Sequence, residues 1–294
     1  MKKLTPRLIV DHPIAMVDSM ITISVSDLHP NQKVTVAGLI EEGKIQCISH
    51  AHFIADELGQ VNLRTDSSLS GTYTGIDSMG IIWSMAYCTK GTRLIKRNAS
   101  LPYKLHLFVM EGFQRIHDKG CINNVLCEST VERWYLASDT KRIPIRHGNI
   151  RGTLFTPRQT DGQTRRPGII DMFGLMGGLM EYRAALLASY GYSVLALTYF
   201  RHDDLPQTLE LDYSYFEEAA EFLLNHSSVD KSQGLAVIGM SKGAEIALHM
   251  ASYDASIRAC VAINSSSFYM YGNNTYKGRD LQAFAATLTH LTDR

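Results

Sequence analysis

The half of the chain that follows Pro144 alternates short apolar runs with amphipathic segments, and this alternation restricts the fold more than any other feature. Apolar runs of strand length lie at residues 167–173, 192–199, 235–238 and 257–263. Segments with helical periodicity lie between them, at residues 179–190, 212–225 and 242–253. Continuous apolar strands separated by helices are typical of a parallel sheet covered on both faces. We therefore predict an α/β domain over residues 141–294.

The preceding part of the chain has the shorter period of β-strands. Alternating or β-prone runs lie at residues 21–25, 33–37 and 105–109, and turn signals such as Glu42-Gly43 separate the early strands. Several short strands with no long helical segment predict an all-β, immunoglobulin-like sandwich over residues 1–140. A length of 294 residues suits two domains.

The pentapeptide Gly239-Met240-Ser241-Lys242-Gly243 follows the predicted strand at 235–238 and precedes the predicted helix at 242–253. A G-x-S-x-G sequence at a strand-to-helix turn is typical of a nucleophilic serine. Glycine at 239 and 243 allows the tight turn, and the Lys242 backbone N–H at the helix N-terminus can stabilise an oxyanion. The alternative is a plain glycine-rich turn with a capping serine.

A second glycine-rich segment, Gly174-Leu175-Met176-Gly177-Gly178, follows the predicted strand at 167–173. In α/β-hydrolases a loop at this position supplies the other oxyanion N–H, so Gly174, Leu175 and Met176 are candidates. The alternative is a phosphate-binding dinucleotide loop, but the spacing is not G-x-G-x-x-G.

Composition excludes several other classes of function. The chain contains 29 Lys and Arg residues and 29 Asp and Glu residues. Its formal net charge is therefore zero, which does not favour binding to nucleic acid or to an acidic membrane. The five cysteines lack the CxxC spacing of zinc sites, and we expect reduced packing residues, no metal and no cofactor. No apolar run spans a bilayer and no SKL-type address ends the chain, so we expect a cytoplasmic protein rather than a mitochondrial or peroxisomal one.

From about Pro6 to about Asp280 the sequence resembles the family that joins acyl-CoA thioesterases with bile acid-CoA:amino acid N-acyltransferases. The motifs that carry the resemblance are 75–80, 83–85, 167–174, 177–184, 204–206, 215–219 and 241–243. The resemblance implies an α/β-hydrolase domain and an acyl-CoA substrate. It also implies hydrolysis through an acyl-Ser241 intermediate, because the conjugating members carry cysteine at that position. The alternative within the family is an acyl-CoA:amino acid N-acyltransferase.

The family's catalytic acid and base follow two further strands that this sequence does not contain. After the nucleophile only two histidines remain. His249 lies about 12 Å along the helix from Ser241, too far to share a proton, so we expect a histidine on the helix face. Asp280 and His290 follow Ser241 in the order serine, aspartate, histidine that the family's triad has along the chain. However, no strand and crossover separate Asp280 from His290.

Upstream, His202 with Asp203 and Asp204 follows the end of a predicted strand, where a substrate-side or structural role is expected. We therefore expect a C-terminally truncated member with its last strands missing and with weak or no activity. The strand at 257–263 is then an open edge unless a helix at 281–291 covers it. A third hypothesis is a non-catalytic truncated or splice product.

Overall fold

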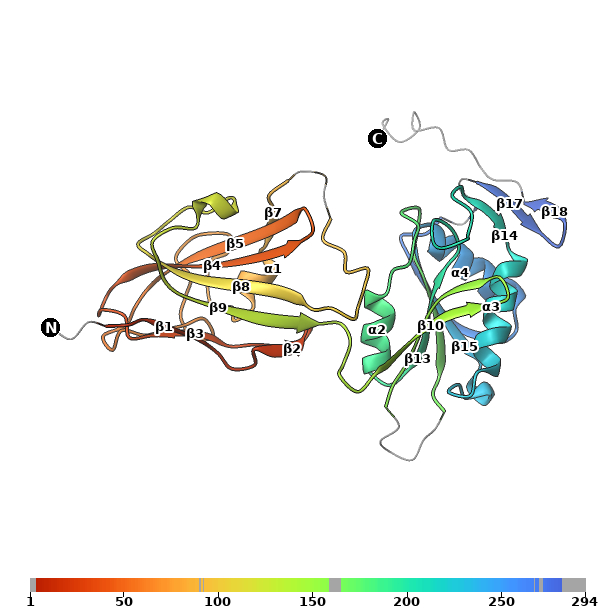
Figure 1. Cartoon of the computed structure of the whole chain (residues 1–294), viewed down its shortest axis with the longest axis horizontal. Helices are drawn as coiled ribbons and strands as arrows, with labels where there is room; N and C mark the ends of the chain where they lie inside the picture. The colour runs from red at the N-terminus through yellow and green to blue at the C-terminus, as the bar shows by residue number, and fades with distance from the viewer. Residues whose placement is uncertain are drawn as a thin grey trace. The chain divides into compact units, whose positions relative to one another are not determined.

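The computed structural model describes residues 4–89, 91, 93–158, 165–266, 268–269 and 272–281. The chain divides into two compact units. The first comprises Met1–Ile95 with Leu101–Trp134, and the second comprises Lys96–Ser100 with Tyr135–Arg294. The first is built mainly from strands and the second from strands and helices (Figure 1), so the prediction of a β-rich N-terminal unit before an α/β unit is confirmed. Within the described ranges, no helix is long and apolar enough to span a bilayer.

Two sheets form the first unit. The larger has the order β2-β9-β8-β4-β5-β7, and the smaller has the order β1-β3-β6. Their bounds are β1 Arg7–Val10, β2 Ile14–Met16, β3 Ile23–Ser26, β4 Lys33–Glu42, β5 Ile45–Ile54, β6 Val61–Asn62, β7 Ala86–Tyr87, β8 Tyr103–Glu111 and β9 Val125–Trp134. Two short helices, α1 (Gly80–Trp83) and the 3₁₀ helix η1 (Lys119–Cys121), lie in the connections.

The β4–β5 hairpin is the longest pairing in this unit, with Lys33 opposite Ile54 and Glu42 opposite Ile45. Its two-residue turn places Gly43 at φ 59°, a conformation that glycine adopts without the Cβ penalty of other residues. Both strands are buried along most of their length, and their buried residues include the polar side chains of Ser49, His50 and His52.

The second unit contains a six-stranded sheet of order β10-β11-β13-β12-β15-β16. β12, β13, β15 and β16 are parallel, whereas β11 runs antiparallel to both of its neighbours. The bounds are β10 Lys141–His147, β11 Ile150–Thr156, β12 Gly168–Met172, β13 Ser193–Thr198, β15 Leu235–Met240 and β16 Ile257–Ile263. The helices are α2 Tyr182–Ser189, α3 Ser214–Asn225, η2 Lys231–Gln233 and α4 Lys242–Tyr253.

Helices cover both faces of this sheet (Figure 1). α2 packs through Ala184, Ala185 and Ala188 against one face, in a cluster with residues of β11, β12 and β13. α3 and α4 pack against the other face, where the larger apolar cluster lies. Burial on both faces explains why every residue of β12 and β13 is buried. β16 is the last strand at its edge among the residues described, and most of its side chains are exposed.

A second, smaller sheet was not anticipated from the sequence. β14 (Glu210–Asp212) pairs in parallel with β17 (Asn273–Tyr276), which forms a hairpin with β18 (Arg279–Leu281). Leu281 is thus a strand residue and not the start of a helix. The remainder of the predicted helix at 281–291 and His290 lie outside the described residues.

Candidate active site

Ser241 occupies the turn between β15 and α4 in a backbone conformation that residues other than glycine rarely adopt. Its φ is 56° and its ψ is −122°. Such a conformation costs on the order of 1–3 kcal/mol and persists only where the surroundings hold it. Here the Ser241 N–H donates to the Ile263 carbonyl oxygen of β16 at 2.9 Å, and the Ser241 carbonyl accepts from Ala244 and Glu245 in the first turn of α4.

Glycines are required on both sides of this turn. A Cβ at Gly239 would collide with the carbonyl group of Gly243, one turn ahead. A Cβ at Gly243 would lie 2.7 Å from the Met172 carbonyl oxygen of the neighbouring strand. The helix therefore begins in direct backbone contact with β12 and β15, and Ser241 lies half-buried at the carboxyl ends of these strands.

The predicted second glycine loop lies against this serine. A Cβ at Gly174 would be 2.7 Å from the Ser241 Cβ and 3.0 Å from its Oγ. Gly174 is buried, whereas Leu175 and Met176 expose 42% and 46% of their surface. The structure thus brings Gly174 into contact range of the serine, and the side chains of the next two residues point to solvent.

A buried ion pair anchors the segment that precedes Gly174. Arg183 of α2 binds the Asp171 carboxylate at 2.8 and 2.5 Å and also donates to the Met172 carbonyl oxygen at 3.1 Å. Burial raises the pKa of Asp171 to about 6, although the Arg183 charge opposes the shift. On the other side, the Tyr199 hydroxyl donates to the Phe173 carbonyl oxygen. An acidic residue within an otherwise apolar strand was the sequence signal for this anchor, and sequence analysis missed it.

The Lys242 side chain enters a buried polar network. Its ammonium lies 2.5 Å from the Glu245 carboxylate and 3.2 Å from the Asn274 side-chain oxygen of β17. Tyr213 donates to the same Glu245 carboxylate at 3.0 Å. Burial lowers the pKa of Lys242, and the Glu245 carboxylate opposes that shift. This network links α4 to the small sheet and leaves the Lys242 backbone N–H at the helix N-terminus, next to Ser241.

Of the two histidines that follow Ser241 in the sequence, His249 is hydrogen-bonded to another residue and His290 is not among the described residues. His249 is buried, and its Nδ1 is hydrogen-bonded to the Tyr269 hydroxyl at 2.7 Å. Burial lowers its pKa. His290 is not among the described residues, and Asp280 lies exposed on β18. Within the described part of the chain, no hydrogen-bond partner of the Ser241 hydroxyl is found.

The acidic pair beside His202 has a structural partner. Asp204 receives two hydrogen bonds from Arg151, at 2.7 and 2.8 Å, and these lower its pKa to about 2. Arg146 binds both Asp203 and Asp204. These contacts fasten the loop after β13 to the start of β11, at the carboxyl edge of the sheet.

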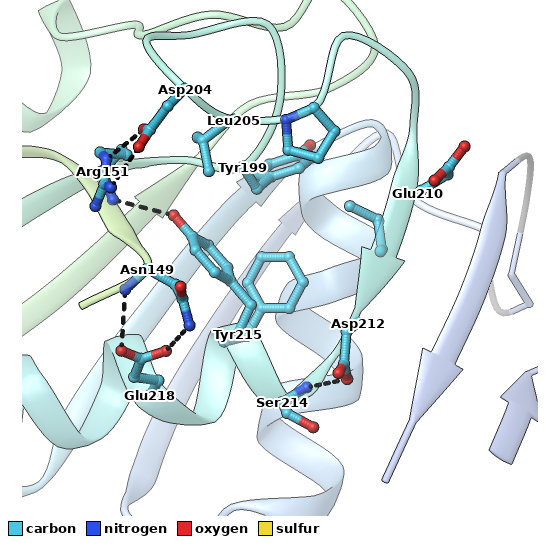
Figure 2. Close-up of a pocket in the computed structure, with 13 residues that line it drawn as sticks. Asn149, Arg151, Tyr199, Asp204, Leu205, Glu210, Asp212, Ser214, Tyr215 and Glu218 are labelled. Carbon is cyan, nitrogen blue, oxygen red and sulfur yellow. Dashed lines mark hydrogen bonds and ion pairs between the residues drawn. The ribbon is translucent and has the colours of Figure 1, made fainter. Parts of the chain in front are cut away.

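This fastened loop forms one wall of a cavity of about 390 Å³ (Figure 2). Figure 2 shows Tyr199, Leu205 and Tyr215 at its apolar centre, with Arg151 and Glu218 among the charged residues around them. The full lining is Asn149, Arg151, Tyr199, Asp204, Leu205, Pro206, Glu210, Leu211, Asp212, Ser214, Tyr215, Phe216 and Glu218. Ser241 does not line it, but Tyr199 connects the cavity to the Phe173 carbonyl beside Gly174.

Sequence comparison identifies related proteins over both units. Residues 18–147 match the profile described as Acyl-CoA thioester hydrolase/BAAT N-terminal region, and residues 211–293 match BAAT / Acyl-CoA thioester hydrolase C terminal. The chain is 41% identical over 266 residues to acyl-coenzyme A thioesterase 2, mitochondrial, of Homo sapiens, covering 90% of this chain and 53% of that protein.

Two further relatives are equally similar. Acyl-coenzyme A thioesterase 1 of Homo sapiens is 41% identical over 266 residues, covering 90% of this chain and 61% of that protein. Bile acid-CoA:amino acid N-acyltransferase of Mus musculus is 41% identical over 268 residues, covering 90% of this chain and 63% of that protein. The chain therefore spans between about half and two-thirds of the length of these relatives.

Proposed function

Because the chain belongs to the family of acyl-CoA thioester hydrolases and bile acid-CoA:amino acid N-acyltransferases, we propose that it acts on acyl-CoA through an acyl ester on Ser241. The observation that carries the proposal is the strained turn at Ser241, with φ 56° and ψ −122°, packed against Gly174. A backbone held in this conformation is the kind of strain that clusters at catalytic sites.

In the proposed reaction the Ser241 oxygen attacks the thioester carbonyl carbon. The new C–O bond pushes the carbonyl electrons onto oxygen, and two N–H groups stabilise the oxyanion. We assign one to Lys242, at the positive end of α4, and the other to the loop 174–176. The C–S bond then breaks, and CoA leaves as the thiol once it gains the proton lost by the serine. Water hydrolyses the ester to free acid in the second half of the cycle.

The proposal assigns no general base to this reaction. Loss of a triad base typically leaves a residual advantage of about 10³- to 10⁴-fold over the reaction in water, through oxyanion stabilisation and binding. We propose that the chain of 294 residues turns over acyl-CoA at such a residual level. Acylation of Ser241 is therefore a better readout than turnover.

The test is mass spectrometry of the purified chain after incubation with a panel of acyl-CoA thioesters and with an activated p-nitrophenyl ester. The expected result is one acyl adduct that maps to the peptide containing Ser241 and is absent from Ser241→Ala. Ser265→Ala is the matched control, because Ser265 is an exposed serine that follows β16. An adduct that persists in Ser241→Ala contradicts the assignment, and absence of any adduct favours the non-catalytic alternative.

A second candidate is transfer of the acyl group to an amino acid, favoured by the 41% identity to the mouse N-acyltransferase. Serine at position 241 favours hydrolysis, because water attacks an oxygen ester readily while a thioester intermediate suits attack by an amine. Supplying glycine or taurine with acyl-CoA separates the two reactions. Free acid as sole product supports hydrolysis, and an amide product supports transfer.

A further inference from the structure

Three side chains with metal-binding atoms converge around η1, in the connection between β8 and β9 of the first unit. They are His117, Asp118 and Cys121, and their ligand atoms all lie within 4.8 Å of one another. The Cys121 Sγ is 3.3 Å from the His117 Nδ1 and 3.6 Å from its Nε2, and the Nε2 is 3.4 Å from the Asp118 Oδ2. None of these residues belongs to the site at Ser241, which lies in the second unit.

Two of the donor pairs are separated by the distances expected around one tetrahedral metal ion. Zinc binds sulfur at about 2.3 Å and nitrogen or oxygen at about 2.0–2.1 Å, so tetrahedral donors lie roughly 3.3–3.6 Å apart. The two distances that meet at the His117 Nε2 fall in this range. A thiolate, an imidazole and a carboxylate are also donors that zinc takes in proteins. The Cys121 Sγ also lies 3.3 Å from the other ring nitrogen, Nδ1, so the His117 ring must turn to direct one nitrogen at an ion shared with the sulfur.

Backbone contacts hold two of the ligands in place. The Asp118 Oδ1 accepts from the Cys121 N–H at 3.2 Å, which caps η1 and leaves the Oδ2 facing His117. Cys121 packs partly against the apolar cluster that contains Leu39 and Ile116. This packing and the cap reduce the side-chain freedom that metal binding must remove.

The electrostatics of the loop favour a cation. The neighbouring Lys119 is turned to the Glu41 carboxylate at 2.8 Å, and so its charge is paired outside the cluster. The side chains of His117 and Asp118 are 76% and 50% exposed, which gives an ion free entry and room for a water ligand. A bound ion would replace the thiol proton of Cys121 and make the local charge balance close to neutral.

We propose that His117, Asp118 and Cys121 bind a divalent transition metal of the zinc class, with water at the fourth position. Binding cross-links three residues of the connection between β8 and β9, around η1. It stabilises the first unit in proportion to the logarithm of metal concentration over Kd, since the unfolded chain lacks the preformed cluster.

The test is titration of the reduced, tag-free chain with Co²⁺, whose bond to a thiolate gives a charge-transfer absorption band. We expect one Co²⁺ per chain, displaced by one Zn²⁺. Cys121→Ser should lose the band, and His117→Ala and Asp118→Asn should each weaken Zn²⁺ binding by about 10-fold or more. These side chains are exposed or partly exposed, and circular dichroism checks that each variant folds.

Cys127→Ser is the matched control, because Cys127 is a partly buried thiol of β9 outside the cluster. Cys88 is less suitable, since the charge of Asp118 contributes to raising the pKa of its thiol, after burial. The control should keep both band and affinity. A band that survives in Cys121→Ser, or a wild-type Kd for Zn²⁺ no tighter than about 1 mM, overturns the proposal.

Discussion

The guanidinium of Arg183 lies over the ring of Phe173, with its central carbon 4.3 Å from the ring centroid. The same group binds the Asp171 carboxylate and the Met172 carbonyl oxygen. One side chain of α2 thus contacts three consecutive residues at the end of β12, immediately before Gly174. We infer that α2 holds Gly174 in position at the serine turn, and that disturbing the ion pair disturbs the proposed oxyanion loop.

The first prediction concerns the pH dependence of stability through Asp171. Its pKa is raised from 3.8 to about 6 in the folded protein, so the folded state binds the proton more tightly than the unfolded state. The free energy of unfolding therefore falls as pH rises through this window, by about 3 kcal/mol, and is level above it. Asp171→Asn removes this pH-dependent contribution to the free energy of unfolding.

Urea unfolding of the wild type and Asp171→Asn, followed across this pH range, measures the effect. Other carboxylates titrate equally in both proteins, so only the difference between them is diagnostic. As pH rises, the free energy of unfolding of the wild type should fall relative to that of Asp171→Asn. A difference that is independent of pH would show that the buried carboxylate is ionised throughout.

The second prediction concerns the contact between Gly174 and Ser241. Gly174→Val places a branched side chain where a Cβ alone is 2.7 Å from the serine Cβ, so either the loop or the serine must move. Misplacement of about 1 Å costs about 10²-fold in rate, and we expect acylation to slow by at least that factor. Ser265→Ala, which changes an exposed side chain outside the proposed site, should leave acylation unchanged. Equal rates in Gly174→Val and wild type would remove Gly174 from the site.

The sequence predicted the large sheet well, because the pattern of neighbouring residues is sufficient to identify each of its elements. The helix predicted at 242–253 is α4 and the strand predicted at 257–263 is β16, with the same bounds. Each is a continuous apolar or amphipathic run between turn residues, so its pattern does not depend on distant contacts. The family resemblance is likewise confirmed by the matches over both units.

The small sheet could not be predicted in this way. β14 and β17 are short and polar, and Glu210 pairs with Asn273 across more than sixty positions of the chain. Likewise Ala99 joins the second unit through its N–H, which donates to the Glu181 carboxylate at 3.1 Å. Such contacts depend on tertiary packing. The cluster at Cys121 has a weak sequence signal for a different reason, because His117, Asp118 and Cys121 do not have the CxxC spacing of common zinc sites.

The third prediction separates the Lys242 side chain from its backbone. Lys242→Met removes the buried ammonium and leaves the Glu245 carboxylate without its cationic partner, which typically costs about 3–5 kcal/mol. The backbone N–H at 242 is unchanged, so acylation of Ser241 in folded protein should persist. Urea unfolding and adduct formation below the transition measure the two effects. Loss of acylation in folded Lys242→Met would assign a direct role to the side chain.

The fourth prediction concerns the strain at Ser241. With φ at 56°, alanine at this position keeps the strained backbone, whereas glycine relieves it. The gain is partly offset by the greater backbone entropy of glycine in the unfolded chain, so we expect Ser241→Gly to be more stable than Ser241→Ala by about 1 kcal/mol. Both variants lack the hydroxyl and should form no acyl adduct. Urea unfolding followed by the helical circular dichroism signal, which comes mainly from the second unit, compares them directly. If Ser241→Gly is the less stable variant, the backbone at 241 is unstrained, and the principal structural support for the nucleophile assignment is lost.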